Sequence, residues 1–166
     1  MKRMAIAVMT AALVATAGLS AQQTSFAGKW TQVVDPAAAP PAGGGGGGGG
    51  RGMGGGGGLC GPACTITQDA TTLTVVRTTQ AGDIKTAYRL DGGESKNSVT
   101  MGPQSVETTS VAKWDGAKLL VTTKQTMGET PVEFKYTVSV VGDELVIERT
   151  GGREGMPAQT LKYKKG

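Results

Sequence analysis

The sequence predicts an all-β fold, an antiparallel up-and-down meander of about 8–10 strands closed into a barrel, with a β-sandwich as the alternative. Thr, Val, Ile and Tyr are abundant after residue 64 and alternate with polar residues in the period of two that half-buried strands show. Asp-Gly and Gly-Asp pairs separate the alternating segments, as hairpin turns require. No segment after the first 21 residues has helical apolar spacing, and 166 residues fit one domain.

The first 21 residues are typical of a cleavable secretory signal peptide. Lys2 and Arg3 form its basic start, residues 5–19 are apolar or small, and Ala21 suits the position before the cut. The apolar stretch is shorter than the roughly 20 residues that a membrane-spanning helix needs. We therefore expect an exported protein, periplasmic or extracellular and not membrane-spanning, with its mature domain over residues 22–166.

Strand-like segments then follow one another along the mature chain. The first covers residues 26–34 and precedes residues 36–58, which are rich in Pro, Ala and Gly. Because that stretch has no apolar face and much backbone entropy to lose, we expect it to be a disordered loop within the domain. The later segments cover residues 65–68, 73–77, 83–90, 98–101, 106–114, 118–126, 132–141, 144–150 and 158–164.

The longer segments have one apolar face and one polar face. Phe134, Tyr136 and Val138 point to one side of an extended chain, whereas Lys135 and Thr137 point to the other. Antiparallel sheets tolerate water on one side, so this pattern indicates a sheet with one buried face.

The composition argues against an enzyme and against a nucleic-acid-binding protein. The chain has no His, which removes His-based triads, His zinc sites and the most common general base at neutral pH. The formal net charge of +4 includes Lys2 and Arg3 of the signal, and the other basic residues cluster only at the C-terminus. The S-x-x-K pattern of penicillin-interacting enzymes occurs once, but Ser110 and Lys113 point to opposite faces of a strand. We expect no catalytic site, cofactor or metal.

Cys60 and Cys64 form the sharpest local motif. An exported chain with two cysteines meets an oxidising environment, and the intervening Gly61-Pro62 turns the chain enough to bring the two Cα atoms within disulfide range. We interpret the pair as a structural disulfide. The alternatives are two free thiols, a thioredoxin-like redox motif with one residue inserted, and a copper site.

Several stretches resemble a known family. Residues 26–30, Phe-Ala-Gly-Lys-Trp, resemble the Gly-x-Trp entry strand of lipocalins and related calycins. Residues 88–97, 112–120, 142–150 and 159–165 are similar to small exported bacterial lipocalin-like proteins of mostly unknown function. The spacing of these stretches is also similar to that of the last strands of fatty-acid-binding proteins.

The resemblance implies a lipocalin-like barrel with Trp30 packed across its closed end and a small apolar or amphipathic ligand inside. The alternative is a structural or envelope interaction protein with a filled core and no ligand, which the glycine tract and the few aromatic residues favour. Arg149 and Tyr163 are loose candidates for the carboxylate clamp of fatty-acid-binding proteins, whose Arg-x-Tyr pattern the sequence does not match. The candidate ligand-facing residues are Tyr88, Trp114, Phe134, Tyr136, Arg149 and Tyr163.

Overall fold

The computed structural model describes residues 23–34, 58–79, 82–101, 104–127, 129–152 and 157–166. The predicted signal peptide and residues 36–57 of the predicted loop lie outside the described residues. Gly58, the last residue of that loop, is described and buried.

The described residues form strands and connections, with no helix among them. The strands are β1 (Gly28–Gln32), β2 (Ala63–Gln68), β3 (Thr72–Thr79), β4 (Gly82–Arg89), β5 (Glu94–Met101), β6 (Gln104–Asp115), β7 (Lys118–Met127), β8 (Thr130–Val141), β9 (Glu144–Gly151) and β10 (Gln159–Lys165). β5 begins four residues before the predicted segment. The prediction started late because residues 94–97 have little intrinsic preference for a strand.

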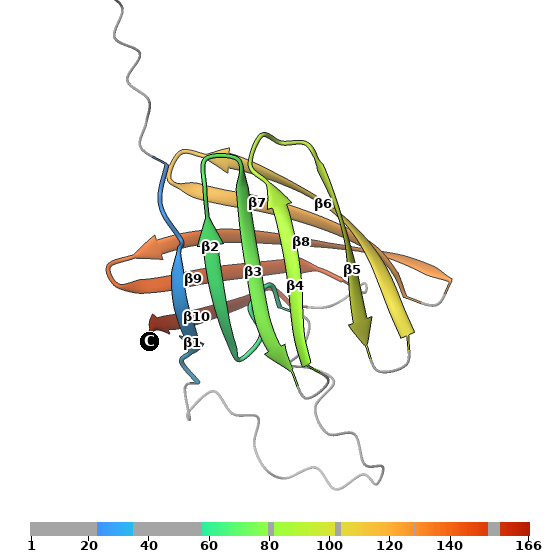
Figure 1. The fold of residues 1–166 in the computed structure, drawn as a ribbon, viewed down its shortest axis with the longest axis horizontal. Coiled ribbons are helices and arrows are strands. Elements are labelled where there is room, and N and C mark those ends of the chain that lie inside the picture. The colour runs from blue at the N-terminus through green and yellow to red at the C-terminus, as the bar shows by residue number, and fades with distance from the viewer. Residues whose placement is uncertain (1–22, 35–57, 80–81, 102–103, 128, 153–156) are drawn as a thin grey trace, which may run out of the picture.

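All ten strands belong to one antiparallel sheet in the order β4-β3-β2-β1-β10-β9-β8-β7-β6-β5. The first and last strands are therefore neighbours, and Trp30 of β1 lies opposite both Cys64 of β2 and Lys165 of β10. In Figure 1, β1 to β5 run upright and cross in front of β8 to β10, so the sheet curls over itself. The all-β, nearly closed barrel confirms the predicted fold class, and the single sheet excludes the sandwich alternative.

The barrel has two ends that differ in their connections, since alternate connections of an up-and-down meander lie at the same end. The turn end has short turns and also the residues just before β1. The loop end has residues 58–62, which lead into β2, together with the connections from β3 to β4, β5 to β6, β7 to β8 and β9 to β10. The short turns of the turn end cover residues 69–71, 91–93, 116–117 and 142–143.

The turns are stabilised by side chains that accept backbone hydrogen bonds and by glycines that adopt positive φ. The Asp69 carboxylate accepts hydrogen bonds from the backbone N–H of Thr71 and Thr72, both at 2.8 Å, and these bonds lower the Asp69 pKa. Asp91 accepts a bond from the Gly93 N–H at 2.8 Å in the same manner. The predicted turn at Asp-Gly 115–116 has Gly116 at a φ of 58°, which a side chain rarely adopts.

The interior is lined by alternate residues of every strand. Burial along β3, β7, β8 and β9 follows the period of two that the sequence predicts. The fully buried inward side chains include Ile66, Leu73, Val75, Leu119, Val121, Val138, Leu145, Ile147 and Tyr163.

Candidate ligand-binding interior

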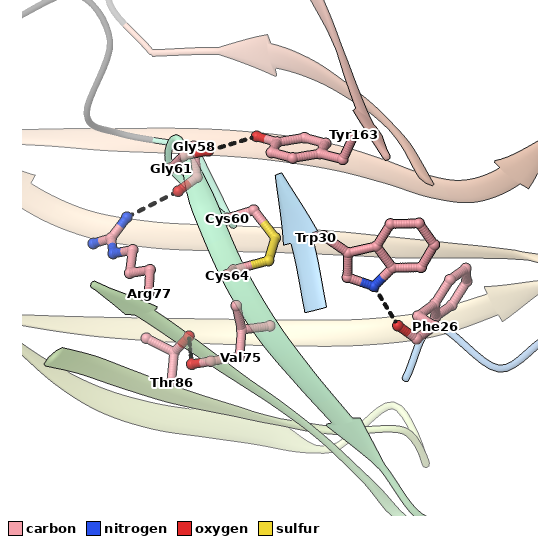
Figure 2. The surroundings of a disulfide bond; sticks show 10 residues. All are labelled: Phe26, Trp30, Gly58, Cys60, Gly61, Cys64, Val75, Arg77, Thr86 and Tyr163. Carbon is pink, nitrogen blue, oxygen red and sulfur yellow. Dashed lines mark hydrogen bonds between the residues drawn. A yellow bond between two sulfur atoms is a disulfide. The ribbon is translucent and has the colours of Figure 1, made fainter. Parts of the chain in front are cut away.

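Aromatic side chains pack together at the turn end. Trp30 is 3% exposed, and its Nε1 donates a hydrogen bond to the Phe26 carbonyl oxygen at 2.8 Å (Figure 2). Phe26 stacks on Trp114 with ring centroids 5.6 Å apart and an interplanar angle of 9°. Trp114, one of the predicted ligand-facing residues, thus packs against Phe26. The cluster therefore covers the interior at this end with apolar surface.

The loop end is covered by residues 58–62 and a disulfide. Cys60 and Cys64 are bonded with their Cα atoms 5.1 Å apart, which confirms the predicted bridge and excludes free thiols. Arg77 Nη1 donates to the Gly58 carbonyl oxygen at 2.8 Å, and Tyr163 Oη donates to the Gly61 carbonyl oxygen at 3.0 Å (Figure 2). Connections usually lie exposed on the surface, so the burial of residues 58–61 shows that this segment packs into the barrel.

The hydroxyl of Tyr163 is thus bonded to the backbone of the loop end. Tyr163 lies opposite Leu145 of β9, whereas Arg149 lies opposite Gln159 of β10. The structure therefore does not place Arg149 and Tyr163 opposite each other, as a two-residue clamp across one ladder would need.

Three other predicted residues do come together. Arg149 and Tyr136 are direct partners in the β8–β9 ladder, and the guanidinium carbon of Arg149 lies 4.6 Å from the ring centre of Phe134. Phe134 is 7% exposed and Tyr136 is 6% exposed, so both rings line the interior. This group combines one positive charge, one phenol and one aromatic face.

Tyr88 and Arg77 face the same interior from the other side of the sheet. Tyr88 is buried on β4 opposite Leu73, and Arg77 follows the buried Leu73 and Val75 in the alternation of β3. Arg77 was not among the residues predicted to face a ligand. The alternation of Leu73, Val75 and residue 77 is the signal that places an arginine on the inward face.

The surroundings of the three tyrosine hydroxyls shift their pKa values. Burial raises the pKa of Tyr136 to about 12 and also raises the pKa of Tyr88. The positive charges of Arg149 and Arg77 act weakly in the opposite direction on the pKa of Tyr136, so both guanidinium groups lie within electrostatic reach of this phenol. Tyr163 also has its pKa raised to about 12 by burial.

Short polar side chains line the part of the interior formed by β5 to β7. Ser110 Oγ and Thr123 Oγ1 are buried and lie 2.9 Å apart, and Thr108 Oγ1 donates to the Asn97 carbonyl oxygen at 3.3 Å. Ser110 points inward while Lys113 is exposed on the outer face, as the strand alternation predicted. The interior therefore contains hydrogen-bonding groups as well as apolar ones.

No group of three or more His, Cys, Asp and Glu side chains in the described ranges could hold a metal ion. The described residues also contain no helix long and apolar enough to cross a membrane. Compared with known proteins, the sequence matches no family model and no curated protein. The inward side chains are therefore the basis for a functional proposal.

Proposed function

We propose that this protein is an exported, lipocalin-like barrel that binds a small amphipathic molecule through an anionic group. The main support is that Arg77 and Arg149 point inward from β3 and β9, whereas the described Asp and Glu residues lie in turns or on the outer face. The signal-like residues 1–21 support export, and the Gly28–Trp30 pattern supports the likeness to lipocalins.

The acidic residues are separated from the inward arginines by the strand alternation. Glu133 of β8 is the neighbour of buried Val132 and Phe134, and its carboxylate pairs on the outer face with Lys124 at 3.9 Å and Lys135 at 3.5 Å. The acids in turns are Asp69, Asp91, Glu129 and Asp143, and the acids on outer faces are Asp83, Glu94, Glu107, Asp115, Glu133, Glu144 and Glu148. An anion entering the barrel would meet positive charge and no carboxylate of these residues.

Arg149 is suited to bind such an anion. Its guanidinium has five N–H donors in one plane, and its central carbon lies over the Phe134 ring, 4.6 Å from the ring centre. In the described part of the chain, Arg149 forms no ion pair with a carboxylate. A carboxylate or phosphate could accept two parallel bonds from it, which is the strong geometry for arginine.

Tyr136 and Arg77 support the same site. Because burial raises the pKa of Tyr136 to about 12, its hydroxyl stays protonated at neutral pH and remains a hydrogen-bond donor. Arg77 adds a second positive charge from the opposite part of the sheet. Apolar side chains such as Val75, Val121 and Ile147 line the interior beyond the arginines and would contact the apolar part of the ligand.

A series of ten-carbon amphiphiles with different head groups tests this proposal. Decanoate, decyl phosphate, decanol and decylammonium would be titrated against the mature protein, with the fluorescence of Trp30 and Trp114 as the readout. We expect an anionic member to bind about ten- to hundred-fold more tightly than decanol, the range for hydrogen bonds to charged groups. The tighter of the two acids identifies the carboxylate or the phosphate as the preferred group.

Arg149→Gln should bring the affinity for the anion close to that for decanol. Arg89→Gln is the matched control, because Arg89 is 60% exposed and pairs with Asp91 outside the barrel. Equal affinities for decanoate and decanol would reject the anionic group and leave a simple apolar binder. If no amphiphile binds, and native mass spectrometry of protein from its own host finds no retained molecule, the filled-core alternative holds.

A further inference from the structure

Ladder hydrogen bonds join every pair of neighbouring strands except β4 and β5, which are the two edges of the sheet. The turn over residues 91–93 holds these strands side by side at the turn end. We call the boundary between them the β4–β5 seam. Because the barrel is otherwise continuous, this seam is where the sheet can part without loss of a ladder.

Side chains of β5 take the place of a ladder at the seam. The Asn97 carboxamide accepts from the Ala87 N–H at 2.8 Å and donates to the Ala87 carbonyl oxygen at 3.0 Å. Ser95 Oγ accepts from the Arg89 N–H at 2.8 Å. These are the backbone groups that a paired strand would otherwise satisfy, so Asn97 and Ser95 compensate for the missing ladder.

The three bonds are concentrated near the turn end. Toward the loop end, the structure describes no backbone hydrogen bond between residues 82–86 and residues 98–101. The inward residues bordering this part are Ile84 and Thr86, both half-buried, and Val99, which is 6% exposed. If the two strands separate here, these side chains become exposed and the interior opens to solvent beside Arg77, which lies opposite Ile84.

We propose that the barrel opens along the β4–β5 seam, that Asn97 holds the seam closed, and that the ligand enters between these strands. The entry route rests on the proposed function, whereas the opening itself can be measured without a ligand. Parting costs the three side-chain bonds and the local packing, while every other boundary would lose a whole ladder. The seam is therefore the weakest boundary of the closed sheet.

Amide hydrogen exchange on the full mature chain tests the opening. Asn97→Ala removes both bonds to Ala87 but leaves Ser95 and its bond to Arg89. If the seam parts as a unit, the Arg89 amide should exchange about ten-fold faster along with the Ala87 amide, while the amides of the β7–β8 ladder stay unchanged. Lys96→Ala, on the outer face of the same strand, is the matched control and should change neither amide.

Asn97→Asp gives a graded test, because a carboxylate accepts from the Ala87 N–H but cannot donate to its carbonyl oxygen. Its exchange rates should fall between those of the original protein and those of Asn97→Ala. If Asn97→Ala accelerates the Ala87 amide alone, the bonds act independently and the seam does not open as a unit, which overturns the proposal.

The entry route is tested by the kinetics of a fluorescent anilinonaphthalene sulfonate, an amphiphile with an anionic group. Asn97→Ala should raise its association and dissociation rates together by about ten-fold, with the dissociation constant changed less than about three-fold. Faster dissociation alone would make Asn97 part of the binding site and reject the route. Faster exchange of both amides with unchanged probe kinetics would also reject it. If the probe binds no variant, the proposed function and the entry route both fail, and the exchange data alone decide whether the seam opens.

Discussion

The two ends of the barrel are built by different means. The turn end has short turns fixed by local chemistry, and its interior is covered by Phe26, Trp30 and Trp114. The loop end is covered by a buried backbone segment that a disulfide, Arg77 and Tyr163 fix in place. The turn end is thus covered by large apolar side chains, whereas the loop end is held by a disulfide and by polar contacts to the backbone.

Under the proposed function, this difference separates residues that only stabilise the barrel from residues that also bind the ligand. Aromatic packing at the turn end contributes mainly to folding, since its side chains contact one another. The inward arginines, which we propose bind the ligand, lie on the halves of β3 and β9 that are nearer the loop end. Substitution of Arg149 should therefore change binding, whereas substitutions in the turn-end aromatic cluster should change stability.

Removal of the largest buried ring should have the greatest effect. Trp30→Ala should lower the free energy of unfolding by about 3–5 kcal/mol, the range for large-to-small changes in a core. Leu120→Ala, on an outer face where the side chain is 40% exposed, should change it by less than about 0.5 kcal/mol. Urea titration measures both values. A change near zero for Trp30→Ala would show that the turn end does not depend on this packing.

Alanine substitutions at two glycines, one at each end, allow the stability of the two ends to be compared. Gly151 of the loop end and Gly142 of the turn end have φ values of 86° and 64°. A Cβ at Gly151 would collide with the Glu133 carbonyl oxygen, whereas a Cβ at Gly142 meets nothing within 4 Å. Gly151→Ala should therefore cost about 2–3 kcal/mol, and Gly142→Ala about 1 kcal/mol for its backbone conformation alone. Equal thermal shifts for the two variants would mean that the backbone at Gly151 relaxes freely.

The disulfide should have a moderate effect that is confined to the loop end. Replacing both Cys60 and Cys64 by Ser should cost roughly 2 kcal/mol on the chain-entropy model of so short a loop. Before that change, denatured protein without reductant should not react with a thiol reagent. Two labelled cysteines per chain would show that the bridge is absent in solution.

Ionisation of the buried tyrosines should have the smallest effect on the free energy of unfolding, because it occurs only at alkaline pH and not at neutral pH. The folded pKa of Tyr136 and Tyr163 is about 12, above the value of 10.0 for a free tyrosine, so folding favours the protonated phenol. This stabilisation is complete below pH 10 and decreases as the pH rises toward 12. Absorbance at the phenolate band should show little ionisation at pH 10 in folded protein and half-ionisation in urea. Half-ionised tyrosines in the folded state at pH 10 would contradict the burial of these side chains.

Local chemistry explains which parts of the fold could be predicted from the sequence. The turns at residues 115–116 and 142–143 were predictable because Asp-Gly and Gly-Asp favour turn conformations without help from distant residues. The alternation of Phe134, Tyr136 and Val138 likewise predicted their common buried face. The early start of β5 was missed because Ser95 and Asn97 belong to that strand through the ladder with β6, which no local pattern records.

The candidate site was predictable in part for the same reason. Arg149, Tyr136 and Phe134 were named as ligand-facing, but their grouping depends on the register of β8 against β9. The alternation of β3 could have placed Arg77 on the inward face, but its bond to the Gly58 carbonyl oxygen joins distant positions of the chain and could not be predicted locally. The stacking of Trp114 on Phe26 joins distant positions of the chain and could not be read from either segment alone.

The pairing of β1 with β10 places Gly166 beside the first strand, since the Gly166 N–H donates to the Lys29 carbonyl oxygen at 3.0 Å. A short linker from residue 166 to residue 23, with new termini in the turn over residues 91–93, would give a circular permutant that runs from β5 to β4. In that chain every ladder joins consecutive strands, and the first-to-last ladder becomes a local hairpin. Lower contact order predicts faster folding, so the permutant should refold more quickly than the natural chain while keeping the same sheet.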